Sequence, residues 1–188
     1  MILSDRSIKE ELQKGNIEIE PFKPECVQPS SVDVHLANKF LIFNKVQHAV
    51  INVREKQSDL MTLVIVKDDE PFILHPGEFV LGSTVERVKM PNHISGRIEG
   101  KSSLGRLGLL IHSTAGYIDP GWDGNLTLEL SNVSPLPIKL FASMKIGQIS
   151  FSQMTTEVDN PYGSEKLKSK YQGQSQPAQS KYYENFEK

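Results

Sequence analysis

Short segments in which apolar and polar residues alternate, separated by proline and glycine, are the feature that most constrains the fold of this chain. The clearest lies at 126–130, where three leucines alternate with Thr127 and Glu129. A period of two places the leucines on one face of a strand and Glu129 on the other. Further strand-like segments lie at 17–20, 32–36, 40–43, 72–74, 78–88, 94–99 and 144–151. Many short strands of this kind predict a mainly β fold, either a sandwich, a jelly roll or a barrel.

The sequence indicates one helix, close to the N-terminus. Ser4 is a suitable N-cap, Gly15 can end the helix, and apolar residues four positions apart lie between them. These features predict a helix over about 5–14, and the segment 101–107 has room for one helical turn. Residues 44–70 are polar and irregular, so the pattern predicts no regular element there.

Composition excludes several classes of protein. The chain has 188 residues, which fits one domain, and its net charge of -2 comes from well-mixed acids and bases. That balance argues against a nucleic-acid-binding surface, which usually carries a basic excess. The single cysteine, Cys26, cannot form an internal disulfide, and no apolar run approaches the roughly 20 residues of a membrane span. We therefore expect a cytoplasmic protein without a signal peptide that binds neither nucleic acid nor membrane.

The composition changes after about Asp159. Residues 1–160 are expected to form the β domain, whereas 161–188 are rich in Lys, Ser, Gln and Gly and have few aliphatic side chains. Such a tail contributes little core, and composition alone favours a frayed terminus. The alternative interpretation is a lid, in which Tyr162, Lys170 and Gln174 close over a charged ligand and exclude water.

The segment Lys101-Ser102-Ser103-Leu104-Gly105-Arg106 is the first candidate motif. Hydroxyls, adjacent backbone amides and two cations are groups that bind phosphate. A capped turn with solvated charges explains the same residues equally well. The segment is not a Walker loop, because the glycine spacing and the Gly-Lys-Ser/Thr order are absent.

The segment from Thr114 to Gly121 is the second candidate motif. Asp119 precedes Pro-Gly, where an aspartate often only caps a turn, but it can also accept a hydrogen bond from a sugar hydroxyl. Tyr117 offers a flat face for a base or sugar, and packing in the core is its alternative. Glu129 is an ordinary solvent-facing residue if its side of the strand is exposed. If that face lines a cleft instead, Glu129 can act as a general base on water.

The sequence lacks the patterns of several other hydrolytic sites. No His-x-x-x-His or Cys-x-x-Cys pair is present, so no zinc site is expected. The Gly-x-Ser-x-Gly elbow and the zinc deaminase signature are also absent, so any deamination would proceed without zinc. His112, two residues before Thr114, suits a structural and a functional role equally.

Together, these segments resemble the dCTP deaminase family of the trimeric dUTPase superfamily. The resemblance rests on 100–106, 114–121, 127–129 and 145–148, and it extends to 3–5, 28–33 and the tail from Pro161 to Gln174. It implies a jelly-roll-like or distorted β-barrel subunit with a short N-terminal helix. It also implies a homotrimer with nucleotide sites between subunits, and it makes the tail a lid.

The resemblance implies a role for each site residue. Glu129 would activate water for attack at C4 of cytosine, and the Ala115 carbonyl would orient that water. Ser102 and Arg106 would bind the base and stabilise the tetrahedral intermediate, and Asp119 would bind the 3′-hydroxyl. The triphosphate, with magnesium, would be held by Ser103, Arg106, Gln148, Tyr162, Lys170 and Gln174. The same resemblance places Lys101, Leu104, Gly105, Thr127 and Leu128 among the substrate-binding residues.

One departure selects a branch of the family. Members that only deaminate carry His-Arg where this chain has Gly116-Tyr117. The latter pair resembles the bifunctional members, which convert dCTP to dUMP, ammonia and pyrophosphate. Lys101 stands where deaminase-only members carry Arg, and lysine lacks the planar fork of arginine. The alternatives are a deaminase that releases dUTP, a plain dUTPase and a non-enzymatic nucleotide sensor, and dTTP is expected to inhibit at the same site.

Overall fold

Strands make up most of the regular structure. The computed structural model describes residues 1–46, 48–67, 69–112 and 114–187. Its elements are, in order, α1 (Asp5–Gln13), β1 (Glu18–Glu20), η1 (Pro24–Cys26), β2 (Val27–Gln28), β3 (Ser31–His35), β4 (Lys39–Phe43), β5 (Met61–Ile65), β6 (Phe72–Leu74), β7 (Phe79–Lys89), β8 (Ile94–Gly100), α2 (Ser102–Gly105), β9 (Leu109–Leu110), β10 (Tyr117–Ile118), β11 (Asp123–Asn132), β12 (Ile138–Leu140), β13 (Lys145–Gln153) and η2 (Tyr182–Asn185). The predicted mainly β fold is confirmed. Within the described ranges, no helix has the length and apolar character needed to cross a membrane.

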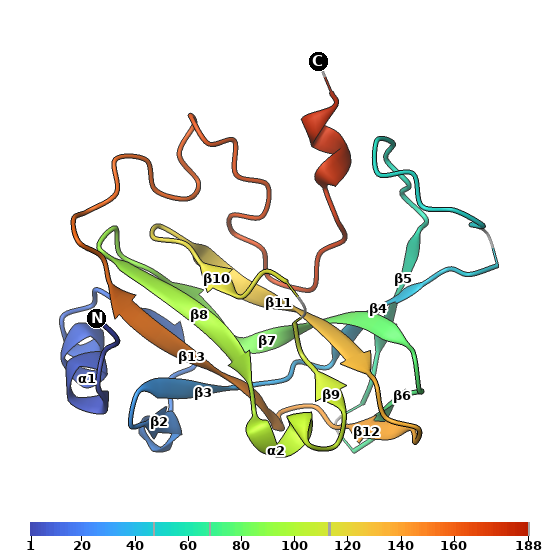
Figure 1. The fold of residues 1–188 in the computed structure, drawn as a ribbon, viewed down its shortest axis with the longest axis horizontal. Helices are drawn as coiled ribbons and strands as arrows, with labels where there is room; N and C mark the ends of the chain where they lie inside the picture. Colours follow the sequence, from blue (N-terminus) through green and yellow to red (C-terminus); the bar gives the residue numbers. More distant parts are fainter. Residues whose placement is uncertain (47, 68, 113, 188) are drawn as a thin grey trace.

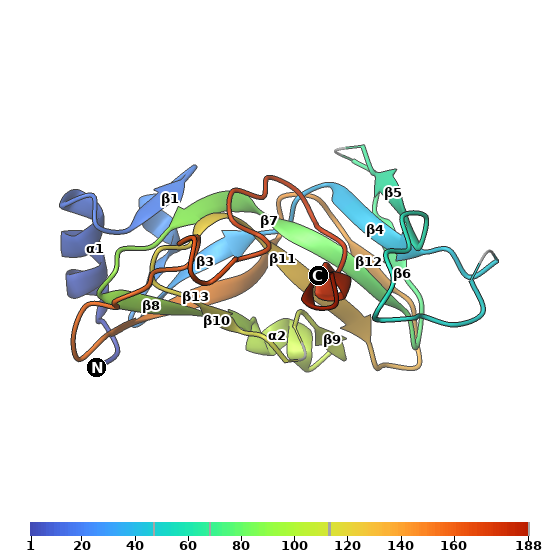
Figure 2. The ribbon, with the colours of Figure 1, turned by 90° about the horizontal axis from the view of Figure 1, so that it is seen from above.

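The strands form two main sheets and one separate pair. The larger sheet has the order β5-β4-β7-β11-β9, with β1 also paired to β7, and the second has the order β10-β8-β13-β3-β2. Figure 1 shows β8, β13 and β3 side by side, and Figure 2 shows α1 and β5 at opposite ends of the molecule. Over the described residues neither sheet closes on itself. The subunit is therefore a pair of open sheets, which fits the jelly-roll part of the prediction rather than a closed barrel.

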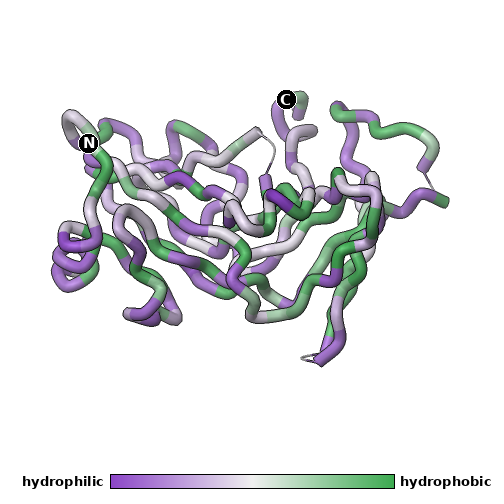
Figure 3. Tube along the Cα trace, turned by 60° about the horizontal axis from the view of Figure 1, so that its bottom comes forward, coloured by the Kyte–Doolittle hydropathy of each residue, from purple (hydrophilic) through white to green (hydrophobic). Residues whose placement is uncertain are grey.

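The hydrophobic core lies between the two sheets. Leu128 and Leu130 of β11 are fully buried, and they belong to the same core cluster as Ile149 and Phe151 of β13. Thr127 and Glu129 are half-buried on the opposite face of β11, which confirms the predicted alternation. Figure 3 shows hydrophobic and hydrophilic residues following one another along the strands, as a sheet with one buried face requires.

The helix prediction is also confirmed. Helix α1 follows Ser4, whose hydroxyl accepts a hydrogen bond from the backbone amide of Ser7 at 3.4 Å. Its end is followed by Gly15 with φ of 70°, a conformation that favours glycine. Short α2 matches the single turn expected within 101–107.

The segment 44–70 differs from expectation, because it contains strand β5. This strand pairs with β4 at the edge of the larger sheet, with Leu63 opposite Leu41. Met61 is buried, whereas Leu63 and Ile65 are 43% and 59% exposed. An edge strand that buries so few of its side chains leaves no clear alternation in the sequence. Residues 47 and 68 of this segment lie outside the described part of the chain.

Candidate active site

A cavity of about 540 Å³ lies between the polar face of β11, the segment around β10 and the C-terminal tail. Many of its lining residues were candidates from the sequence: Ala115, Tyr117, Asp119, Thr127, Glu129, Tyr162 and Gln174. The cavity therefore unites the second motif, the alternating strand and the tail, which are far apart in the sequence.

Strand β11 presents Glu129 to this cavity because its leucines occupy the core. The Glu129 backbone amide donates a hydrogen bond to Ile111 O at 2.8 Å, and Glu129 lies opposite Leu81 of β7. Both neighbours hold the strand in register, so the face on which the carboxylate lies is fixed. The solvent-facing interpretation of Glu129 does not apply, since the residue is half-buried and lines the cavity.

Leu128 takes the opposite orientation. Its side chain is fully buried within the main core cluster, and it is not among the residues that line the cavity. Only its backbone, which is paired with Gly82 of β7, lies next to the site. The structure thus separates Leu128 from Thr127 and Glu129, with which the sequence grouped it.

The segment before β10 is tightly packed at Gly116. Its carbonyl accepts a hydrogen bond from the Ile98 amide at 2.8 Å. A Cβ atom at this position would lie 3.0 Å from Cε1 of His112 and 3.2 Å from Ile98 O. The His112 ring fills this space, and its Nδ1 has no hydrogen-bond partner among the described residues. Any larger residue at position 116 therefore requires His112 or the backbone to move.

Tyr117 and Asp119 lie beyond Gly116 on the same wall. Tyr117 is 71% exposed, with the Arg97 guanidinium 5.7 Å from the centre of its ring, so it is not a core aromatic residue. Asp119 is exposed, and its carbonyl accepts a hydrogen bond from the Trp122 amide at 3.1 Å, which closes the turn. Its side chain lines the cavity, where a ligand hydroxyl can donate to it.

The tail is anchored along the first part of β11. The Gly173 amide donates to Asp123 O at 2.8 Å, and the Asn125 amide donates to Gln174 O at 2.9 Å. The side-chain amide of Gln174 donates to Asn125 O at 2.6 Å and to the Thr127 hydroxyl at 3.0 Å. Figure 1 shows the tail, drawn orange to red, crossing over β10 and β11. This arrangement differs from the frayed end that composition alone favoured.

Two predicted tail residues take different positions. The Tyr162 ring packs against Trp122 with centroids 5.3 Å apart, and burial raises the pKa of its hydroxyl. Tyr162 lines the cavity, near the start of the tail. Lys170 does not line it, because its ammonium group donates to the side chain of Asn185.

The first motif lies elsewhere on the surface. Ser102, Ser103 and Arg106 are exposed in and after α2, and none of them lines the cavity. Leu104 packs partly against the core, and Gly105 is exposed. The structure of one chain therefore does not bring this motif together with Glu129.

A buried carboxylate holds the lysine of the first motif. Lys101 Nζ lies 2.6 Å from Oδ1 of Asp33, and Lys145 Nζ lies 3.0 Å from Oδ2. Burial of Asp33, whose side chain is 2% exposed, raises its pKa, but the hydrogen bonds from the two lysines outweigh this effect and lower the pKa overall. Gln148, also predicted to bind phosphate, accepts a hydrogen bond from the Ser31 hydroxyl at 3.2 Å in the same sheet. Asp33 was not a candidate from the sequence.

Sequence reasoning also missed the apolar wall of the cavity. It consists of side chains from β4, β5, β7 and the segment between β4 and β5: Phe43, Ile51, Leu60, Met61, Phe79 and Leu81. No chemical motif marks these residues, and their only signal is apolar character within or beside a polar stretch. Across the described ranges, no group of three or more His, Cys, Asp or Glu side chains is arranged to hold a metal ion.

Comparison with known proteins identifies the family. A family model described as dCTP deaminase-like matches residues 2–154. A protein of Mycolicibacterium gilvum named "dCTP deaminase, dUMP-forming" is 55% identical over 188 residues, covering 100% of this chain and 99% of its own. A protein of the same name from Corynebacterium glutamicum is 55% identical over 186 residues, covering 99% and 98%.

A solved structure shares the fold. The 2′-deoxycytidine 5′-triphosphate deaminase of Agrobacterium tumefaciens superposes with a TM-score of 0.61 at 22% identity. The match covers 80% of this chain and 47% of that one, so this chain spans about half of that protein's length. The family model and the full-length relatives show that this chain belongs to the dCTP deaminase-like family.

Proposed function

We propose that this chain is a bifunctional, dUMP-forming dCTP deaminase. One water replaces the 4-amino group of cytosine and releases ammonia, and a second cleaves the bond between the α and β phosphates to give dUMP and pyrophosphate. The observation that carries the proposal is the position of Glu129, a carboxylate on the polar face of a core strand that lines one cavity with Ala115 and Asp119. The names of the Mycolicibacterium and Corynebacterium relatives support the same reaction.

Glu129 is the general base in this proposal. It takes a proton from water as the oxygen attacks C4 and passes that proton to N3, and it then moves the proton of the new hydroxyl to the amine as the C4–N4 bond breaks. The carbonyl of Ala115, on the facing wall of the cavity, orients the water. Ser102 and Arg106 donate hydrogen bonds to the tetrahedral intermediate, where fixed donors have their largest effect.

The rest of the cavity suits a nucleoside. Asp119 accepts a hydrogen bond from the 3′-hydroxyl, and the exposed ring of Tyr117 provides a flat face beside it. Gly116 adds no side chain to this wall, and the His112 ring already fills the space next to it. We assign the second hydrolysis to a water that reaches the α phosphate because no bulky side chain stands at position 116.

The first motif enters the site from a neighbouring copy of the chain. This part of the proposal is supported by the exposure of Ser102, Ser103 and Arg106 and by their absence from the lining of the cavity. In a cyclic homotrimer, each site then combines the Glu129 of one subunit with the Arg106 of the next. This arrangement brings to the site the Ser102 hydroxyl and the Arg106 guanidinium, which do not line the cavity of a single chain.

Mixed trimers test the shared site. Two inactive variants, Glu129→Gln and Arg106→Ala, are co-expressed with different tags, and trimers that carry both tags are isolated. In a cyclic trimer of either mixed composition, one of the three sites receives both intact residues. About one third of the wild-type rate is therefore expected, whereas mixed trimers as inactive as the parents would show that Glu129 and Arg106 act within one chain.

The substrate is the magnesium complex of the triphosphate, in which Mg²⁺ binds phosphate oxygens and water. Lys101, Ser103, Arg106 and Gln148 hold the phosphates from the neighbouring copy. Tyr162, Lys170 and Gln174 hold them when the tail closes as a lid. The tail's position supports this role, because Tyr162 and Gln174 line the cavity and the tail is hydrogen-bonded along β11.

A single substitution tests the assignment of the base. Glu129→Gln keeps the size of the side chain and removes the base, so the deamination rate should fall by a factor of about 10² to 10⁴. Binding of dCTP with magnesium, measured by calorimetry, should remain. The exposed Glu157→Gln serves as the matched control. An unchanged deamination rate in Glu129→Gln would exclude Glu129 as the base.

A further inference from the structure

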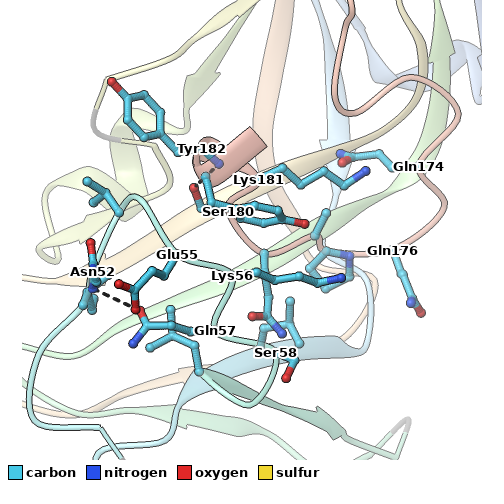
Figure 4. Close-up of a pocket in the computed structure, with 18 of the residues that line it drawn as sticks. Asn52, Glu55, Lys56, Gln57, Ser58, Gln174, Gln176, Ser180, Lys181 and Tyr182 are labelled. Carbon is cyan, nitrogen blue, oxygen red and sulfur yellow. Dashed lines mark hydrogen bonds between the residues drawn. The ribbon is translucent and has the colours of Figure 1, made fainter. Parts of the chain in front are cut away.

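A second cavity, of about 650 Å³, lies on the outer side of the tail. Its walls are the loop 51–60 and the tail segment 173–183, and Figure 4 shows Lys56, Gln57, Gln174 and Lys181 around it. Both this cavity and the candidate active site are lined by Ile51, Leu60, Gln174, Ala178 and Ser180. The tail segment that carries Gln174 therefore lies between the two cavities, and Ile51 and Leu60 of the loop 51–60 reach both of them.

The loop 51–60 is fixed by its own hydrogen bonds. The Asn52 amide donates to the side-chain oxygen of Gln57 at 3.1 Å, a contact drawn in Figure 4. The Arg54 amide donates to the side-chain oxygen of Asn52 at 3.1 Å, and the Leu60 amide donates to Gln57 O at 3.2 Å. These contacts give the loop a defined shape without help from a sheet.

Two cations of this loop lie over aromatic rings at the end of the tail. The Arg54 guanidinium carbon is 5.4 Å from the centre of the Phe186 ring, and Lys56 Nζ is 6.0 Å from the centre of the Tyr183 ring. Tyr183 belongs to η2, and Phe186 follows directly after it. Contacts of this type are attractive, and both join segments about 130 residues apart in the chain, so they hold the end of the tail to the body of the protein.

The other end of the same tail segment is held at the candidate active site. Thr127, two residues before Glu129, accepts hydrogen bonds from the Gln174 side chain at 3.0 Å and from the Ala178 amide at 3.3 Å. The segment 174–186 is therefore anchored at one end on β11 and at the other end on the loop 51–60. A change at either anchor should therefore alter how well ordered the segment 174–186 is.

We propose that Arg54 and Lys56 are positioning residues for nucleotide binding, because they hold the tail in place over the site from outside. This inference rests on the proposed function in one respect, that the tail closes over the triphosphate. A tail that is already held pays less ordering entropy when the nucleotide binds. Arg54 and Lys56 therefore act on the affinity for substrate without touching the reacting atoms.

Paired variants test the inference. Arg54→Ala/Lys56→Ala removes the cations, and Tyr183→Leu/Phe186→Leu removes the rings but leaves the cations. Each pair is expected to raise KM for dCTP about 5- to 30-fold with little change in kcat. Combining all four substitutions should add little, because both pairs remove the same contacts. Lys67→Ala, at a lysine whose side chain is 86% exposed, is the control for loss of a surface charge.

Hydrogen exchange without nucleotide gives a readout independent of catalysis. Amides of 173–187 should exchange faster in both paired variants than in the wild type and in Lys67→Ala. Unchanged exchange, or faster exchange with an unchanged KM, would overturn the inference. A wild-type protein that converts neither dCTP nor dUTP would refute the proposed function instead, and the exchange rates would still decide whether the loop holds the tail.

Discussion

Replacing Asp33 with asparagine tests the most buried charge near the proposed phosphate-binding motif. The carboxylate is 2% exposed, and each of its oxygens accepts a hydrogen bond from a different lysine, Lys101 or Lys145. Asp33→Asn preserves the shape of the side chain and removes its charge. Lys101, with a side chain only 25% exposed, then keeps a positive charge beside a neutral amide.

The size of the effect follows from these contacts. A hydrogen bond to a charged group contributes about 1.5–3 kcal/mol, and breaking a buried pair by removing one partner costs about 3–5 kcal/mol. Solvent screens the contact with Lys145, so the loss comes mainly from Lys101. We expect Asp33→Asn to lower the free energy of unfolding by about 3 kcal/mol. For a chain of this length that corresponds to a fall in Tm of roughly 6–12 °C.

The same interaction predicts a dependence on pH. The pKa of Asp33 is lower in the folded protein than in the unfolded chain, where it is about 3.9. Its stabilising contribution is therefore complete above about pH 4 and is lost as the pH falls through the lowered pKa of the folded state. The difference between wild type and Asp33→Asn should be constant from pH 8 to about pH 5 and should shrink below pH 4.

Thermal and urea unfolding at one fixed protein concentration measure this difference. Asp159→Asn, at an exposed position, is the matched control and should change the free energy of unfolding by less than about 0.5 kcal/mol. If Asp33→Asn behaves like Asp159→Asn at pH 7, the reasoning fails. It also fails if the difference persists undiminished into acid.

Three further predictions concern the candidate site and the tail. Gly121 has φ of 86° and a Cβ there would lie 2.5 Å from Pro161, so Gly121→Ala should displace the start of the tail, raise KM for dCTP and speed proteolysis of the tail. Gly116→His/Tyr117→Arg should shift the product of dCTP turnover from dUMP to dUTP, read by chromatography, because the new side chain at 116 requires His112 or the backbone to move. We propose that dTTP binds the same pyrimidine site, so it should raise KM for dCTP in steady-state assays, and an unchanged rate at low dCTP with saturating dTTP would reject this.

Local patterns in the sequence predict what depends on local geometry. The alternation at 126–130 placed Glu129 opposite the leucines, and the structure confirms it because a strand has a period of two wherever it lies. The helix at the N-terminus followed in the same way from Ser4 and Gly15. Local patterns do not predict which residues meet across the fold. Asp33 and Lys101 are 68 residues apart, and their contact depends on how β3 and β8 are placed around β13, which no local pattern encodes.

The same limit explains why the sequence did not reveal the other parts of the site. Ile51 and Leu60 lie in or beside a polar, irregular stretch and line the cavity only because β5 pairs with β4 at the sheet edge. The tail, by composition, resembled a frayed terminus because it has few aliphatic side chains, whereas in the structure it is hydrogen-bonded along β11. In the sequence, only the resemblance of its motifs to a family indicated a lid. Ser102 and Arg106 are exposed and lie outside the cavity, and only the resemblance of their motif to a family gave them a role in the site.

A time course of product formation tests the proposed function most directly. The purified protein is incubated with dCTP and magnesium, and dUTP, dUMP and pyrophosphate are separated by anion-exchange chromatography. We predict that dUMP and pyrophosphate appear together from the first time point without a build-up of dUTP. Accumulation of dUTP would contradict the bifunctional reaction and leave a deaminase only, and survival of dCTP with cleavage of added dUTP would show a dUTPase and contradict the role of Glu129.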